Sequence, residues 1–90
     1  MPNMTYRATH RNGTAGALPS KVTTRRGRGF RLKIRNLHAT DDLNISFDTG
    51  KTFFPIAAGT TFDEDIAFHF FYVQRGAAAD VDYSAMLFEG

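Results

Sequence analysis

The chain has 90 residues, of which 42% are hydrophobic and 13% aromatic, so its composition is that of one folded domain and not of a disordered chain. It contains no cysteine, which excludes a disulfide framework and a cysteine-based zinc site. Nine of the eleven Lys and Arg residues lie at or before Arg35, whereas all nine acidic residues lie at or after Asp41. This dipolar sequence favours contact with an acidic protein, with nucleic acid or with the acidic half of another copy.

The first residues, MPNMTYRATH, lack the apolar core of a signal peptide, and no apolar run approaches the roughly 20 residues of a membrane helix. We therefore expect a soluble, intracellular product. Residues 1–27 show no sustained period of 2 or 3.6 and are rich in Thr, Gly and Arg. They are predicted to form an extended basic arm, with at most a short strand near residues 21–24. The folded domain is expected to comprise residues 28–90.

The pattern of the first strand begins at Phe30, where apolar residues alternate with basic ones over FRLKIR. Such alternation is typical of a half-buried strand. We expect Phe30, Leu32 and Ile34 to point into a core, and the basic row to point outward.

Further strands are predicted over LNISF at 43–47, over TFFPI at 52–56 and over VDYSAMLF at 81–88. The sequence of residues 48–51, DTGK, is a turn signal that should join the first two as a hairpin. Pro55 cannot donate a ladder hydrogen bond, so its strand should lie at an edge or a bulge. Strands at about ten-residue spacing without an amphipathic helix predict an all-β fold. We expect a small antiparallel β-sandwich or a partly open barrel, with an extended N-terminal arm.

The sequence IAFHFFYVQ, residues 66–74, is apolar on both alternating faces. This pattern predicts one strand, which is either a central strand covered on both faces or a strand with one face in the core and the other in an interface between copies of the chain. We favour the second. The predicted interface residues are His69, Phe71 and Val73. In this interpretation His69 is a packed or interface histidine and not a general base.

No constellation for catalysis is evident. The acidic group at 63–65 lacks the ligand spacing of a calcium loop and is interpreted as a solvated turn. The three histidines, at positions 10, 38 and 69, have no metal-ligand spacing, and no serine lies in a nucleophile elbow. We therefore predict a protein that is not an enzyme and that uses neither a metal nor another cofactor.

The arginine-rich segment RRGRG, residues 25–29, together with the basic row that follows, is the main candidate for partner binding. Guanidinium groups bind carboxylates and phosphates alike, so an acidic protein and nucleic acid both fit, and an idle solvated face is the third interpretation. We favour contact with a protein. The candidate residues are Arg25, Arg26, Arg28, Arg31, Lys33 and Arg35.

The segments IRNLHATDDLNISFDTGKTFFPIAAGTTFDEDI, FHFFYV and DYSAMLFEG resemble small virion structural proteins of tailed bacteriophages, in particular capsid decoration or cement proteins. The resemblance covers about residues 33–90 and not the segment before residue 28. It implies a non-enzymatic homo-oligomer, a trimer or dimer, that binds and stabilises the lattice of the major capsid protein. It also implies assembly in the host cytoplasm and a final location on the capsid surface of the virion.

Three alternatives remain open at this point, and the weakest is a sugar-binding sandwich, because the chain has no tryptophan to stack on a sugar ring. The protein could belong to the tail, the neck or the head fibres, because the same β module suits each position. It could also be a small basic nucleic-acid-binding protein that acts through its N-terminal arm, in which case its affinity for oligonucleotides should fall steeply with salt.

Overall fold

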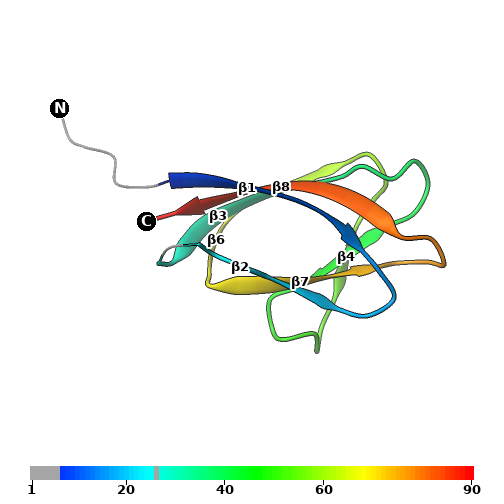
Figure 1. The fold of residues 1–90 in the computed structure, drawn as a ribbon, viewed down its shortest axis with the longest axis horizontal. Coiled ribbons are helices and arrows are strands. Elements are labelled where there is room, and N and C mark those ends of the chain that lie inside the picture. Colours follow the sequence, from blue (N-terminus) through cyan, green and yellow to red (C-terminus); the bar gives the residue numbers. More distant parts are fainter. Residues whose placement is uncertain (1–6, 26) are drawn as a thin grey trace.

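The computed structural model describes residues 7–25 and 27–90, and Figure 1 shows two β-sheets packed face to face. All strand pairs are antiparallel, and the described residues contain no helix. The predicted all-β fold is therefore confirmed, as a sandwich and not as a partly open barrel. Within the same residues, no helix is long and apolar enough to cross a membrane.

Each sheet has four strands, and the two sheets differ in strand length. Sheet A has the spatial order β1 (Arg7–Ala15), β8 (Val81–Glu89), β3 (Gly29–Asn36) and β6 (Thr61–Phe68). Sheet B has the order β2 (Ser20–Thr23), β7 (Phe70–Arg75), β4 (Leu43–Ser46) and β5 (Phe54–Ile56). Consecutive strands alternate between the sheets, and among the eight described strands only β4 and β5 follow one another within one sheet.

The N-terminal segment is part of the sandwich. β1 pairs with β8 along its whole length, and β2 pairs with β7. The boundary predicted between an arm at 1–27 and a domain at 28–90 is therefore wrong for residues 7–25, although the short strand expected near 21–24 is confirmed. Residues 1–6 lie outside the described part. Sequence periodicity missed β1 because its inward positions include Arg11 and Gly13, and backbone pairing with β8 holds the strand without an apolar face.

The core lies between the two sheets and is built from the inward residues of both. The half-buried Phe47 packs against this core, and its ring centroid lies 6.0 to 6.3 Å from those of four other phenylalanines. Aromatic rings at this spacing contribute packing beyond the area that they bury. Nine described apolar residues have no exposed surface: Ala15, Leu32, Ile34, Leu43, Ile45, Phe71, Val73, Val81 and Leu87.

β3 follows the predicted alternation with one exception. Leu32 and Ile34 are fully buried, as expected, but Phe30 is 41% exposed and lies 6.4 Å from the ring of Phe88. The register of β3 shifts between Gly29 and Arg31, which turns Phe30 out of the core. The ring of Phe68 packs against the backbone of Gly29 on the core side of β3. A Cβ atom on Gly29 would lie only 2.5 Å from that ring.

The segment 66–74 is not one strand. β6 ends at Phe68 in sheet A, and β7 begins at Phe70 in sheet B, so the chain crosses between the sheets at His69. The crossing changes the phase of burial: Phe68 points inward before it, and Phe71 and Val73 point inward after it. Apolar residues on both alternating faces thus reflect a change of sheet.

The predicted hairpin at residues 43–56 is confirmed, since β4 pairs with β5, and Pro55 lies in an edge strand. In its loop, Ser46 donates a hydrogen bond of 2.6 Å to Asp48 Oδ1, and the Thr52 amide donates one of 2.8 Å to the same oxygen. These hydrogen bonds lower the pKa of Asp48 to about 2, and the bond from Ser46 has the largest effect.

Asn36, at the end of β3, connects the two sheets. Its side chain has no exposed surface, and its Nδ2 donates hydrogen bonds to the carbonyl oxygens of Asp41 at 2.8 Å and Ile56 at 2.9 Å. Its Oδ1 accepts a bond of 2.8 Å from the His38 amide. The buried amide is therefore fully used, and it fixes the loop after β3 against β5.

Candidate functional site

β3 carries the basic row that the sequence predicts on the outer face of sheet A. Lys33 and Arg35 are exposed, and the residues between and beside them are buried. Neither cation forms an ion pair or a hydrogen bond with another described residue. Both charges are therefore available to a partner.

Arg31, the first residue of the row, is already engaged within sheet A. Its Nε and Nη2 donate two bonds of 2.9 Å to the carboxylate of Asp63, and its guanidinium carbon lies 4.9 Å from the ring centroid of Phe88. The hydrogen bonds from Arg31 lower the pKa of Asp63. Arg31 thus belongs to a bidentate ion pair on the sheet surface. Its guanidinium group is already bound to Asp63, which argues against its predicted role in partner binding.

The acidic residues 63–65 lie in the middle of β6, so their interpretation as a turn is wrong. They are opposite β3, with Asp63 across from Lys33 and Asp65 across from Arg31. Opposite charges on facing strands stabilise a sheet, and this cross-strand pairing accounts for Asp63 and Asp65, whereas Glu64 lies opposite Leu32.

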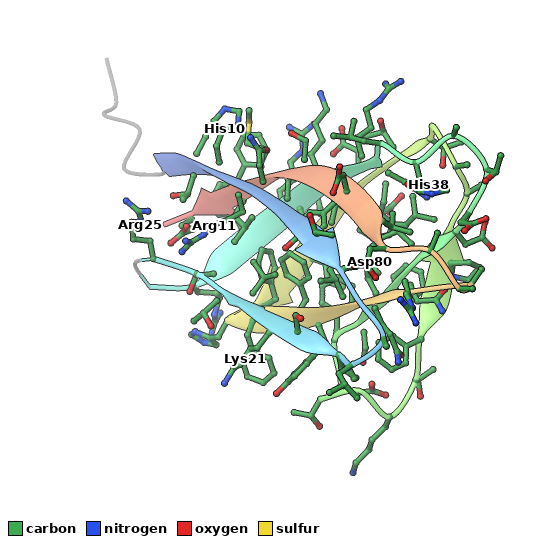
Figure 2. All side chains as sticks on the ribbon, turned by 45° about the vertical axis from the view of Figure 1, so that its right-hand side comes forward. His10, Arg11, Lys21, Arg25, His38 and Asp80 are labelled. Carbon is green, nitrogen blue, oxygen red and sulfur yellow. The ribbon has the colours of Figure 1, made fainter. Side chains whose placement is uncertain are left out.

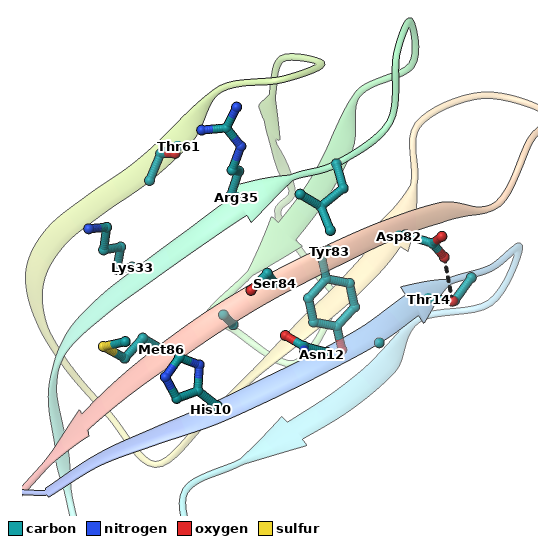
Figure 3. A pocket seen from close by; sticks show the side chains of 13 residues that line it. His10, Asn12, Thr14, Lys33, Arg35, Thr61, Asp82, Tyr83, Ser84 and Met86 are labelled. Atoms are coloured by element: carbon teal, nitrogen blue, oxygen red, sulfur yellow. Dashed lines mark hydrogen bonds between the residues drawn. The ribbon is translucent and has the colours of Figure 1, made fainter.

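Beside Lys33 and Arg35 the outer face of sheet A forms an open hollow of about 870 Å³, shown in Figure 3. We call it the cationic hollow. Its sides come from β1 and β3, its floor comes from β8, and Leu37, beyond the end of β3, adds an exposed apolar side chain. Further side chains that line it are those of His10, Asn12, Thr14, Thr61, Asp82, Ser84 and Met86.

The chemistry of the cationic hollow suits an acidic group on a larger surface. Two cations, an imidazole and several amide or hydroxyl groups can bind carboxylate or phosphate oxygens, while Met86 and Leu37 offer apolar contact. At one end of the hollow Thr14 donates a hydrogen bond of 2.6 Å to Asp82 Oδ1, so one oxygen of that carboxylate already has a partner (Figure 3). Within the described residues no cluster of three or more His, Cys, Asp or Glu could hold a metal ion.

The other predicted basic residues lie elsewhere. Arg25 and Arg28 are exposed at the turn between β2 and β3, and neither lines the cationic hollow. Figure 2 shows Arg25 on the same side of the sandwich as Arg11 and Lys21. Arg26 lies outside the described residues. The five predicted basic residues that the structure describes therefore do not form one site.

The prediction of an oligomer interface is wrong for two of its three residues, because they are buried in the core. Phe71 and Val73 have no exposed surface and belong to the core, so they cannot line an outer interface. His69 is exposed at the crossing between β6 and β7, and its carbonyl accepts a bond of 2.9 Å from the Thr24 amide. The outward residues of β7 are Phe70 and Tyr72, half-buried and 5.9 Å apart.

The β1 side of the cationic hollow was not predicted from the sequence. His10, Asn12 and Thr14 alternate on one face, but their inward neighbours give no apolar pattern that would reveal a strand. Gly13 lets the ring of Tyr83 pack against bare backbone, since a Cβ atom there would lie 2.7 Å from the Tyr83 hydroxyl. The only usable signal was the alternation of polar residues in RATHRNGTA.

Comparison with protein-family models, with curated proteins and with solved structures found no match to this chain. The site is therefore interpreted from its own geometry and chemistry.

Proposed function

We propose that this protein is a non-enzymatic virion structural protein, of the capsid decoration or cement kind, that binds an acidic surface of the major capsid protein. The observation that carries the proposal is the pair of exposed cations, Lys33 and Arg35, beside an open hollow and without an ion-pair partner among the described residues. The resemblance of residues 33–90 to phage decoration proteins supports the same function.

The shape of the site favours a protein over a small molecule. The cationic hollow lies open on a sheet face, whereas small ligands are usually held in clefts that bury most of their surface. Arginine and lysine beside a thioether and an exposed leucine offer the mixture of charge and apolar contact found in protein interfaces. One such contact is weak, but a lattice that presents many copies multiplies it by avidity.

Nucleic-acid binding is the second candidate, and one observation favours it. On the outer face of sheet B, Phe70 and Tyr72 are half-buried, and the Lys21 ammonium lies 4.5 Å from the Phe70 ring centroid. Aromatic rings beside a cation are typical of surfaces that stack single-stranded bases. The aromatic pair could equally be covered by a protein, so we rank this function below capsid binding.

The first test is the composition and imaging of purified particles of the virus that encodes the chain. We expect mass spectrometry to detect the protein in the particles, and cryo-electron microscopy to place it on the capsid with sheet A facing the coat protein. Particles without this chain would refute the proposal. A position in the tail, neck or head fibres would refute the capsid assignment.

The second test measures binding to capsids assembled without the chain. Reversal of both charges, Lys33→Glu with Arg35→Glu, should weaken binding by at least roughly tenfold, because like charges then face an acidic surface. Lys51→Glu, at an exposed loop next to sheet B, is the matched control and should bind as the wild type does. Unchanged binding of the double variant, or tight binding to single-stranded DNA abolished by Phe70→Ala, would favour another function.

A further inference from the structure

The two outer edges of sheet A are long and unpaired. β1 has nine residues and β6 has eight, and no backbone hydrogen bond joins the outer edge of either strand to another described residue. Sheet B ends instead in strands of four and three residues, and Pro55 interrupts the shorter one. A long free edge is a template for another strand, so sheet A is the sheet that can be extended.

The two edges of sheet A carry opposite charge. β6 contains Asp63, Glu64 and Asp65 in succession, and Glu64 and Asp65 have exposed side chains. β1 contains no acidic residue and carries Arg11, and Lys21 of β2 lies on the same side of the sandwich (Figure 2). The molecule therefore has an acidic edge and a basic edge, separated by the width of the sheet.

This charge pattern selects between the ways in which two copies can pair. Two β6 edges would bring acidic residues together, and two β1 edges would bring basic residues together, and like charges on facing strands are destabilising. An acidic β6 edge beside a basic β1 edge is favourable. The four strands of sheet A alternate in direction, so β1 and β6 run in opposite directions. If a second copy lies beside the first in the same orientation, its β1 is therefore antiparallel to β6 of the first copy.

We propose that copies of this protein associate head to tail, with β6 of one copy pairing with β1 of the next and sheet A continuing from copy to copy. The partner is thus a second copy of the chain. Such a heterologous contact produces a ring if the rotation between copies closes, and a filament if it does not. The inference does not depend on the proposed binding of the cationic hollow to a capsid.

The register of sheet A indicates which residues would meet. Leu32 lies opposite Glu64 on one side and Leu87 on the other, and Leu87 lies opposite Thr9. Continuation of this row places Glu64 opposite Thr9 of the next copy. In that register Arg11 of the next copy lies diagonally across from Glu64, at a separation that long side chains span.

Arg11 is suited to this contact. Continuation of the neighbouring row, from Ile34 to Phe62 and from Ala85 to Arg11, places Arg11 of the next copy opposite Phe62. The ring of Phe62 packs against those of Phe47 and Phe54 but is only half-buried, so its exposed part can contact a guanidinium group. Arg11 Nη2 donates to the Thr23 carbonyl at 3.1 Å, whereas its Nε is buried without a hydrogen-bond partner among the described residues.

The experiment compares two charge-reversed variants by sedimentation velocity over a range of concentrations at low salt. The β6 variant carries Glu64→Lys and Asp65→Lys, and the β1 variant carries Ala8→Glu and Arg11→Glu. In the extended register Ala8 lies opposite Asp65 of the adjacent copy. The wild type should form rings or filaments, and each variant should associate at least roughly tenfold more weakly.

Mixing the two variants is the decisive step. In an equimolar mixture, an assembly in which the two variants alternate contains only junctions of opposite charge. The basic β6 of one variant meets the acidic β1 of the other, and the unchanged acidic β6 meets the unchanged basic β1. Assembly should therefore return to the wild-type level. A mixture that stays monomeric, or a wild type that is monomeric at millimolar concentration, would overturn the proposal.

Two controls make the result unambiguous. Ala8→Glu alone changes an exposed residue, so it tests the β1 edge even if loss of Arg11 disturbs the fold. It should weaken association in the same direction, and unchanged association would contradict the inference. Lys33→Glu with Arg35→Glu should keep wild-type self-association, which separates a failure of edge pairing from a failure of capsid binding.

Discussion

The two sheets of the sandwich share one core but differ in what they present to the outside. Sheet A has strands of eight or nine residues, a charged outer face with the cationic hollow, and two long edges of opposite charge. Sheet B has strands of three to six residues, and its outer face carries the aromatic pair Phe70 and Tyr72. Sheet B thus mainly closes the core, whereas sheet A carries the surfaces that we propose for association.

The largest effect is expected from the inner face of sheet B. Phe71→Ala removes a ring with no exposed surface that packs against Phe47 and Phe68. Its loss should lower the free energy of unfolding by about 3–5 kcal/mol. Phe70→Ala, the matched change on the outer face, should cost about 1 kcal/mol. Urea denaturation measures both, and equal losses would show that the outer face of sheet B also supports the fold.

The next effect tests the link between the sheets. Asn36→Ala leaves the carbonyl groups of Asp41 and Ile56 and the amide of His38 without their partner. Unfolding free energy should fall by about 1–3 kcal/mol, because buried polar groups lose their bonds. Amide hydrogen exchange should rise in the loop 37–42 and in β5 more than elsewhere. Uniformly faster exchange along the chain would argue against a local link.

A smaller effect is expected on the outer face of sheet A. The side chains of Arg31 and Asp63 are 40% and 36% exposed, so solvent screens their ion pair. A double-mutant cycle with Arg31→Ala and Asp63→Ala should give a coupling of about 0.2–1 kcal/mol, lower at high salt. A larger coupling, independent of salt, would mean that this face is as important to stability as the core.

The smallest effect at neutral pH should come from the loop between β4 and β5 of sheet B. The pKa of Asp48 is lowered from 3.8 to about 2, so the folded state binds fewer protons than the unfolded state as pH falls. Its contribution to stability is complete above about pH 3.8 and is lost as the pH falls toward 2. Asp48→Asn should flatten this part of the melting-temperature profile. If the melting temperature of the variant falls at low pH as that of the wild type does, other carboxylates cause the loss of stability in acid.

Local patterns predicted the strands whose two faces differ clearly. Alternation located β3 and β8, the DTGK signal located the turn between β4 and β5, and Pro55 indicated an edge strand. The prediction failed where the tertiary structure changes the phase: at the register shift beside Gly29, and at the crossing between sheets at His69. No property of a single strand reveals either event.

The candidate site was predicted only in part for a related reason. Lys33 and Arg35 follow from the alternation of β3, but the opposite side of the cationic hollow comes from β1, about twenty residues earlier in the chain. β1 holds its place through backbone pairing with β8, which leaves little trace in residue type. The engagement of Arg31 by Asp63 likewise depends on the pairing of β3 with β6.

The path of the chain between the sheets has a mechanical consequence. Consecutive strands alternate between sheet A and sheet B, except from β4 to β5, so the chain crosses between the two sheets several times. A shear force that slides one layer over the other must therefore load the covalent backbone at each crossing. Layers joined in this way can transmit tension without separating.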